Sequence, residues 1–269
     1  MSDLNEKKTC LKSILEELTK QDCCVAFSGG VDSSLLLVMA CEAAEENKTK
    51  VYAITADTVL HPKADLTIAK EVLAMTSAEH VVLTIDELTV PEIENNPVNR
   101  CYLCKKELMT RMLDFVKKQQ CGCLLEGSNE DDLHVYRPGF QAVKELGVRS
   151  PLAECGITKK EVRMLAAEYE IPVANRPSSP CLATRLPYDT KLDLSLLKKI
   201  DYTEEKIKDL GFINVRVRVH SDLVRIEVDS NDLEKVLEMK DTIIILVKKQ
   251  GFKYVTLDLI GFRSGSMDE

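Results

Sequence analysis

The stretch CCVAFSGGVDSS, residues 23–34, decides how this chain folds. Its first five residues form an apolar run typical of a buried strand, and the run LLLVMA at residues 35–40 is typical of a helix. A glycine-rich turn between a strand and a helix lets backbone N–H groups converge on an anion, and the helix N-terminus adds partial positive charge. The stretch therefore predicts a phosphate-binding loop.

This loop differs from two common nucleotide-binding motifs. It has neither the lysine and longer spacer of a Walker A loop nor the GxGxxG pattern of dinucleotide folds. The string SGGVDSS instead resembles the PP-loop of ATP pyrophosphatases, which implies that it holds the β,γ-diphosphate of ATP while the α–β bond is cleaved. The residues expected to bind the nucleotide are Ser28, Gly29, Gly30, Asp32, Ser33 and Ser34. A strand–turn–helix with incidental glycines is the simpler alternative.

Length and composition exclude several classes of protein. With 269 residues, 45% of them hydrophobic, the chain is not globally disordered and can form one large domain, or a large and a small one. No apolar run approaches the roughly 20 residues of a membrane span, and the first residues are polar, so we expect a cytoplasmic protein with no membrane partner. The net charge of −8 argues against a general nucleic-acid binder, although a local basic patch is compatible with it.

Apolar runs alternate with helical patterns along the first two thirds of the chain. Strands are expected at residues 25–27, 51–55, 80–85 and 123–127, and helices at 33–46, 63–75 and 104–119. This alternation predicts an α/β fold with a doubly wound, mostly parallel sheet, whose ligands lie at the carboxyl ends of the strands. Asp57 and Ser128 follow the second and fourth strands, so both are candidates for nucleotide binding. Asp57 is equally compatible with a solvated loop acid.

A different organisation begins after Pro187. A helical pattern at residues 192–210 is followed by strict apolar–polar alternation at 214–220 and 223–228, which predicts a hairpin with one buried face. We therefore expect a PP-loop ATP pyrophosphatase domain at 1–186 and a smaller C-terminal α+β domain at 187–269. The second domain is expected to bind substrate and to form a homo-oligomer.

Ten cysteines are many for a chain expected in a reducing compartment, where buried thiols, metal ligands and catalytic thiols are commoner than disulfides. Five lie in or beside apolar runs and are interpreted as core residues: Cys23, Cys24, Cys41, Cys121 and Cys123. Cys10 and Cys155 have no partner that the sequence identifies.

Three further cysteines have a different context. Cys101 and Cys104 form a CxxC pair at a predicted helix start, and Cys181 lies in a proline-flanked loop. A CxxC alone is compatible with a redox pair, half a zinc site or coincidence, and no second CxxC completes a zinc site. Three cysteines can also ligate three irons of a [4Fe–4S] cluster and leave the fourth open. Spacing alone does not choose between a cluster and unrelated thiols.

A wider set of motifs resembles one family. EGSNEDD at 126–132, YRPG at 136–139, RSPLAE at 149–154, TKKEVR at 158–163, PCLATR at 180–185 and DLIGFRSGSM at 258–267 occur in this order. Together with the PP-loop they look like the LarE family of ATP-dependent sulfur transferases, which help to build the nickel-pincer nucleotide cofactor. The resemblance implies adenylation of the carboxylates of pyridinium-3,5-biscarboxylic acid mononucleotide and their conversion to thiocarboxylates.

The family has two branches that differ in the source of sulfur. In one, a single cysteine of the Cys-Leu-Ala loop gives up its own sulfur; in the other, that cysteine joins a CxxC pair to hold a [4Fe–4S] cluster carrying a sulfide. This sequence resembles the second branch, which implies Cys101, Cys104 and Cys181 as cluster ligands, Cys181 as a catalytic residue, and a sulfide donor as partner.

Other residues acquire expected roles from the same chemistry. Asp32 is expected to be catalytic and to help position Mg²⁺ among the phosphate oxygens. Arg185 is a candidate for binding the carboxylate or phosphate of the mononucleotide substrate. Arg216 and Arg218 share one strand face that suits a phosphate, or that is an ordinary solvated face.

Three other functions are compatible with parts of the sequence. A PP-loop tRNA thiolase also uses clustered cysteines, but the acidic charge and the lack of an RNA-binding module argue against it. An ammonia-using ligase shares SGGVDSS but needs no placed cysteines. A non-enzymatic adenine-nucleotide sensor would release no pyrophosphate when substrate is added.

Overall fold

The computed structural model describes residues 2–62, 64–134, 138–174, 180–263 and 266–267, so parts of the motifs at 136–139 and 258–267 lie outside the described residues. The chain divides into two compact units. The first comprises Met1–Val59, Lys63–Glu87 and Asn99–Ser179, and the second comprises Leu60–Pro62, Leu88–Val98 and Pro180–Glu269. The division expected after residue 186 took no account of the two short early segments in the second unit.

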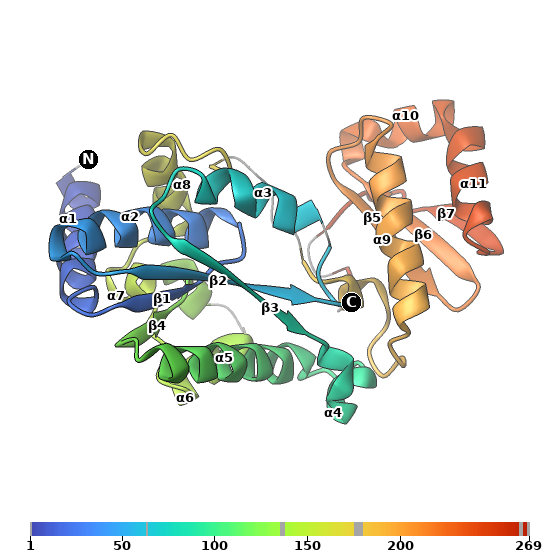
Figure 1. Ribbon diagram of the computed structural model, residues 1–269. Coiled ribbons are helices and arrows are strands. Elements are labelled where there is room, and N and C mark those ends of the chain that lie inside the picture. The colour runs from blue at the N-terminus through green and yellow to red at the C-terminus, as the bar shows by residue number, and fades with distance from the viewer. Residues whose placement is uncertain (1, 63, 135–137, 175–179, 264–265, 268–269) are drawn as a thin grey trace. The chain divides into compact units, whose positions relative to one another are not determined.

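The first unit is built on a parallel sheet of four strands in the order β3-β2-β1-β4 (Figure 1). The strands are β1 (Cys23–Ala26), β2 (Val51–Thr58), β3 (Glu79–Ile85) and β4 (Cys123–Leu125). In register, Cys23 pairs with Val51 on one side and Cys123 on the other. The carboxyl ends of β1 and β4 therefore open at the same edge of the sheet.

Helices cover both faces of this sheet, which confirms the predicted doubly wound α/β class (Figure 1). On one face lie α1 (Ser2–Leu18), α2 (Val31–Asn47), α3 (Ala64–Leu73) and α8 (Lys159–Glu168), and on the other α5 (Arg100–Gln119) and α6 (Pro138–Glu145). Leu15, Leu36 and Leu165 belong to the first core, while Met112 and Val143 belong to the second. Burial on both faces explains why the strands read as continuous apolar runs.

The cysteines of β1 confirm the interpretation as core residues. Cys23 faces the α2 side of the sheet and Cys24 the α5 side, and both are fully buried. Burial raises the pKa of both thiols, and it raises the pKa of Cys41 and of Cys123 to about 11. These groups therefore remain neutral thiols near pH 7 and act as small apolar side chains.

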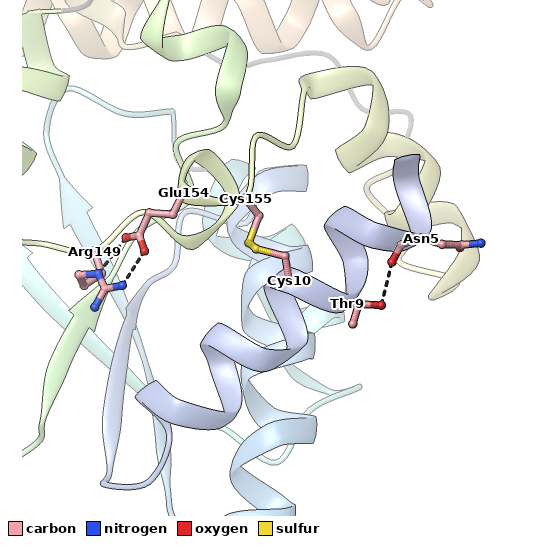
Figure 2. The surroundings of a disulfide bond; sticks show 6 residues. All are labelled: Asn5, Thr9, Cys10, Arg149, Glu154 and Cys155. Carbon is pink, nitrogen blue, oxygen red and sulfur yellow. Dashed lines mark hydrogen bonds and ion pairs between the residues drawn. A yellow bond between two sulfur atoms is a disulfide. The ribbon is translucent and has the colours of Figure 1, made fainter. Parts of the chain in front are cut away.

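Cys10 and Cys155, for which the sequence identifies no partner, form a disulfide within the first unit (Figure 2). The bond joins α1 to the residue that follows the short helix α7 (Pro151–Glu154). Arg149, which precedes α7, donates from two of its nitrogens to the two carboxylate oxygens of Glu154 at the end of α7. The disulfide and this ion pair thus both stabilise the segment between β4 and α8.

The second unit contains a mixed three-stranded sheet in the order β5-β6-β7. β5 (Val215–His220) and β6 (Leu223–Val228) are antiparallel, as the alternation predicted, and β7 (Tyr254–Leu257) runs parallel to β6. The helices are α4 (Pro91–Glu94), α9 (Leu194–Lys208), α10 (Leu233–Glu238) and α11 (Lys240–Lys249). Among the described helices of the whole chain, none has the length and apolar character that crossing a membrane requires.

One expectation about this hairpin is wrong. Every residue of β5 from Val215 to Val219 is buried, so the strand has no solvated face. Arg216 and Arg218 alternate with valines as predicted, but each is only 4% exposed. Arginine at such positions requires hydrogen-bonding partners, because an unpaired buried charge is costly.

Candidate active site

The loop after β1 has the geometry of an anion-binding turn. Gly29 has φ +72°, and a Cβ at this position would lie 3.2 Å from the Cβ of Ala69, so both conformation and space require glycine. Gly30 is the N-cap of α2, with an extended backbone and no side chain to cover the helix end. The first N–H groups of a long, apolar helix therefore point out of this turn.

Serine side chains order the loop. The Ser33 hydroxyl donates to the carbonyl of Gly30 at 3.1 Å and lies 3.1 Å from the hydroxyl of Ser28. Ser34 is fully buried, and its hydroxyl makes no hydrogen bond within the described part of the chain. A buried hydroxyl without a partner beside a helix N-terminus fits an oxygen-rich ligand such as phosphate.

Asp32 is the charged residue of this loop. Its Oδ1 accepts a hydrogen bond of 3.0 Å from Nδ2 of Asn129, and its Oδ2 accepts one from the ammonium group of Lys159. Asn129 is buried at the end of β4, where its side chain also caps the 3-10 helix Glu130–Leu133. The carboxylate is thus oriented by two donors that come from different segments.

Lys159 is a residue that sequence reasoning missed. It is the first residue of α8, whose capping box between Thr158 and Glu161 is visible in the sequence as Thr-x-x-Glu. Its backbone N–H donates to the carboxylate of Asp131, in the loop after β4, at 2.9 Å, and its ammonium group donates to Asp32 of the PP-loop. The capping box predicted a helix start, but only the fold brings that start to Asp32.

The end of β4 forms the opposite wall of the loop. A Cβ on Gly127 would lie 2.9 Å from the backbone nitrogen of Ser33, so the two segments touch through backbone atoms. Glu126 is buried, accepts from the Ser128 backbone at 3.0 Å and the Ser150 hydroxyl at 2.5 Å, and pairs with Lys105 at 3.3 Å. Although burial opposes it, Lys105 and these donors hold the pKa of Glu126 below its usual range. The structure thus places Ser128 beside the PP-loop, as its position after the strand led us to expect.

Asp57 lies in a different place from the one expected. β2 continues through Thr58, so Asp57 belongs to the strand and pairs in register with Thr84 of β3. It is half-buried near the carboxyl end of the sheet. Its role in nucleotide binding stays a prediction.

The CxxC pair lies in the first turn of α5. Cys101 is exposed and Cys104 is half-buried, and a spacing of three residues puts both thiols on one face of the helix. Arg100 lies within 3.8 Å of the sulfur of Cys101. Both thiols belong to the first unit, whereas Cys181 belongs to the second.

Cys181 precedes the 3-10 helix Leu182–Arg185 and is half-buried. Its carbonyl accepts hydrogen bonds from the Thr184 hydroxyl at 2.7 Å and from the guanidinium group of Arg185 at 3.0 Å. Arg185 also donates to the carbonyl of Pro180 at 2.8 Å. The conformation of this cysteine loop is therefore set by backbone contacts to one arginine.

Arg185 is itself held by a buried ion pair. It is 1% exposed, and two of its nitrogens donate to the two carboxylate oxygens of Glu204, each at 2.8 Å. Although burial opposes it, Glu204 raises the pKa of Arg185. The sequence suggested a substrate ligand here, and the structure shows a guanidinium that positions the Cys181 loop.

Arg216 and Arg218 lie two residues apart on one face of β5, and both are buried. Arg218 donates to Glu227 at 3.0 Å and to the carbonyl of Thr184 at 2.7 Å, and Arg216 donates to the carbonyl of Val215 at 2.8 Å. Burial and the charges of Arg185 and Arg218 lower the pKa of Arg216 to about 10. Both arginines are therefore buried cations, and the cationic form of Arg216 is less favoured than that of an exposed arginine.

Comparisons with known proteins agree with this geometry. A family model described as a PP-loop domain matches residues 4–134. Over 269 residues the chain is 35% identical to pyridinium-3,5-bisthiocarboxylic acid mononucleotide synthase of Lactiplantibacillus plantarum, covering 100% of this chain and 96% of that protein. It is 33% identical over 267 residues to an uncharacterized protein of Synechocystis sp., covering 98% of each chain. An uncharacterized protein of Methanocaldococcus jannaschii is 32% identical over 255 residues, covering 94% of this chain and 96% of its own.

The similarity extends over both units and includes the phosphate-binding turn described above. The enzyme class follows from the same two findings, a PP-loop domain and a full-length likeness to a synthase. The chain belongs to the LarE family of ATP-dependent sulfur transferases.

Proposed function

We propose that this protein adenylates the carboxylates of pyridinium-3,5-biscarboxylic acid mononucleotide and replaces them with thiocarboxylates during synthesis of the nickel-pincer nucleotide cofactor. The proposal rests on one observation above others. The PP-loop carboxylate Asp32 is held between Lys159 and Asn129 in a chain that is similar, over its full length, to a synthase whose name gives that product.

The first half-reaction is activation of a carboxylate by ATP. A carboxylate is a poor electrophile, and its ester with AMP has a good leaving group. The N–H groups at the start of α2 and the hydroxyls of Ser33 and Ser34 would bind the pyrophosphate portion. Lys159 would exchange its bond to Asp32 for phosphate oxygens, which leaves the Asp32 carboxylate to hold Mg²⁺.

The mononucleotide phosphate is assigned to the arginines of the second unit. Arg216 and Arg218 are buried, and the lowered pKa of Arg216 reflects this burial first and the neighbouring charges of Arg185 and Arg218 second. A phosphate dianion would relieve this repulsion and accept charge-assisted hydrogen bonds. Arg185 keeps the loop of Cys181 in one conformation while substrate binds.

The sulfur is assigned to a cluster held by Cys101, Cys104 and Cys181. Two thiols on one face of a helix are a donor set that suits iron, because cysteine sulfurs are the ordinary ligands of such clusters. When bound, a [4Fe–4S] cluster with an open iron would supply the sulfide that displaces AMP. The chain itself would supply the ligands, bind both nucleotides and spend no side chain.

The test uses anaerobically purified full-length protein with ATP, Mg²⁺, a sulfide donor and the biscarboxylic acid mononucleotide. AMP, pyrophosphate and the thiocarboxylate product should accumulate together, and Asp32→Ala should abolish all three. Formation of ADP and phosphate would overturn the assignment of the PP-loop. Formation of a thiolated tRNA in place of the mononucleotide product would move the protein to the tRNA thiolases.

A further inference from the structure

The last described residues of the chain return to the sheet of the second unit. The backbone N–H of Phe262 donates to the carbonyl of Val228 at 2.7 Å, which extends the contacts of β6 beyond its end. The turn before it needs glycine, because Gly261 has φ +82° and a Cβ there would lie 3.0 Å from the same carbonyl. This turn directs Phe262 onto the arginines of β5.

Phe262 contacts one of these arginines directly. Its ring centroid lies 4.9 Å from the guanidinium carbon of Arg216. A ring in such a contact attracts the cation through its π face, whereas the N–H donors of a guanidinium point outward in its plane. Phe262 therefore restricts the orientation of Arg216 without competing for the hydrogen bonds that an anion needs.

Ser266 acts on the second arginine through a carboxylate. The Ser266 hydroxyl is buried and donates to Oε1 of Glu227 at 2.6 Å. Oε2 of Glu227 accepts from Arg218 at 3.0 Å, and Oε1 also pairs with Arg225 at 3.2 Å. Because Glu227 is fully buried, the orientation of its carboxylate sets the position of the Arg218 guanidinium.

The backbone at Ser266 is held by the same network. The guanidinium of Arg225 lies 3.4 Å from the carbonyl of Ser266 and 3.6 Å from the sulfur of Met267. Arg225 also pairs with Asp258, in the segment that leads to the Gly261 turn. The end of the chain is thus joined to β6 by side chains and backbone.

We propose that Phe262 and Ser266 are positioning residues that preorganise Arg216 and Arg218 for the phosphate group of the mononucleotide substrate. This inference rests on the proposed function, which puts that phosphate at these two arginines. Preorganisation raises affinity because less side-chain entropy is lost on binding. Phe262 and Ser266 would then determine how tightly the mononucleotide binds, without contacting it themselves.

Two pairs of variants test the role of each residue in the full-length protein. Phe262→Leu removes the aromatic ring, whereas Phe262→Tyr keeps it. Ser266→Ala removes the hydroxyl donor, whereas Ser266→Thr keeps it. Tyr254→Leu is the matched control, because Tyr254 is an exposed aromatic residue on β7 of the same sheet.

The readouts are direct binding of pyridinium-3,5-biscarboxylic acid mononucleotide by calorimetry, the KM for ATP, and the melting temperature. We expect Phe262→Leu and Ser266→Ala to weaken mononucleotide binding by about 10-fold each, as the loss of one such contact implies. The KM for ATP should not change, and Phe262→Tyr and Ser266→Thr should bind the mononucleotide as tightly as the wild type.

Three results would count against the inference. Equal mononucleotide affinity in wild type and both disruptive variants overturns it while leaving the proposed function intact. A loss of affinity that Tyr and Thr fail to restore, with a lowered melting temperature, identifies a purely structural role and also overturns it. A wild-type protein that binds ATP but not the mononucleotide overturns the proposed function, and this inference with it.

Discussion

The ammonium group of Lys159 forms an ion pair with the carboxylate of Asp32 across 127 residues of sequence. Lys159 begins α8, and Asp32 lies in the first turn of α2. Because the lysine side chain is 36% exposed, the pair adds little to stability. Its position beside the PP-loop is the basis of the role in phosphate binding that we propose for Lys159, in place of the lysine that a Walker A loop would supply.

Lys159→Met should lower kcat/KM for ATP by about 10²-fold, the usual cost of losing one charged donor at a developing negative charge. The melting temperature should change little, because the pair is partly exposed. Lys160→Met is the control, since Lys160 is exposed on the same helix turn. The measurement is pyrophosphate release at varied ATP. Equal effects of the two variants would contradict a role for Lys159 in phosphate binding.

Gly127→Ala should weaken ATP binding without unfolding the protein. The new Cβ would lie 2.9 Å from the backbone nitrogen of Ser33, so it forces the end of β4 away from the PP-loop. Gly122→Ala is the control, because a Cβ there meets mainly the flexible side chain of Gln21. Binding of ATP by fluorescence or calorimetry should fall at least about 10-fold for Gly127→Ala only, in keeping with tight packing. An unchanged affinity would show that the two segments adjust freely.

Replacing any one of Cys101, Cys104 and Cys181 by alanine should lower iron content and abolish sulfur transfer while ATP binding persists. Cys41→Ala is the control, because Cys41 is a buried core thiol. Intact mass after turnover separates the two sulfur sources. Loss of one H₂S from the chain, with Cys101→Ala fully active, would show that Cys181 gives up its own sulfur.

The disulfide between Cys10 and Cys155 should contribute to the stability of the first unit. It closes a sequence separation of 145 residues, and disulfides in general contribute about 2–4 kcal/mol. The double variant Cys10→Ala/Cys155→Ala should therefore unfold at lower urea concentration than wild type. Wild type in a thiol reductant should match the variant, and a wild type insensitive to reductant would contradict the assignment.

Glu87 should make stability depend on pH. The side chain is fully buried and accepts from the backbone of Val59 at 3.2 Å, and burial raises its pKa. The pKa of Glu87 is thus higher in the folded than in the unfolded protein. Its favourable contribution to the free energy of unfolding is complete at pH values below the unfolded-state pKa, and it is lost as pH rises through the folded-state pKa. Glu87→Gln, which stays neutral, should be more stable than wild type near neutral pH.

The stability of Glu87→Gln and of wild type is measured from about pH 4.5 to about pH 8, a range that begins at the ordinary pKa of a glutamate and extends well above it. The difference in unfolding midpoint should shrink as pH falls. Thr76→Ala, which removes a half-buried hydroxyl that donates to the carbonyl of Leu73 at the end of α3, is a suitable control. A difference that does not vary with pH would assign the effect to packing and not to charge.

The boundaries of the first unit show how far periodicity reaches. The expected strand at 80–85 agrees closely with β3, because apolar patterns report burial directly. The expected helix at 104–119 ends with α5, but α5 begins earlier, at Arg100, so the CxxC pair lies inside the helix. The observed β2 extends three residues beyond the expected end at residue 55, because the polar residues Asp57 and Thr58 still pair with β3. Where a strand ends depends on the length of the strand it pairs with, as well as on its own residues.

By itself, the sequence determined the PP-loop, the parallel α/β class and the family, because each depends on local residue types and their spacing. The tertiary structure alone decided that Lys159 meets Asp32, that Cys10 bonds to Cys155, and that the arginines of β5 are buried. Alternating charged and apolar residues give the same sequence pattern whether the charged side chains are exposed to water or buried against other polar side chains. The paired strand supplies Glu227, and a later segment supplies Phe262 and Ser266; their positions, which the tertiary structure sets, surround the two arginines of β5.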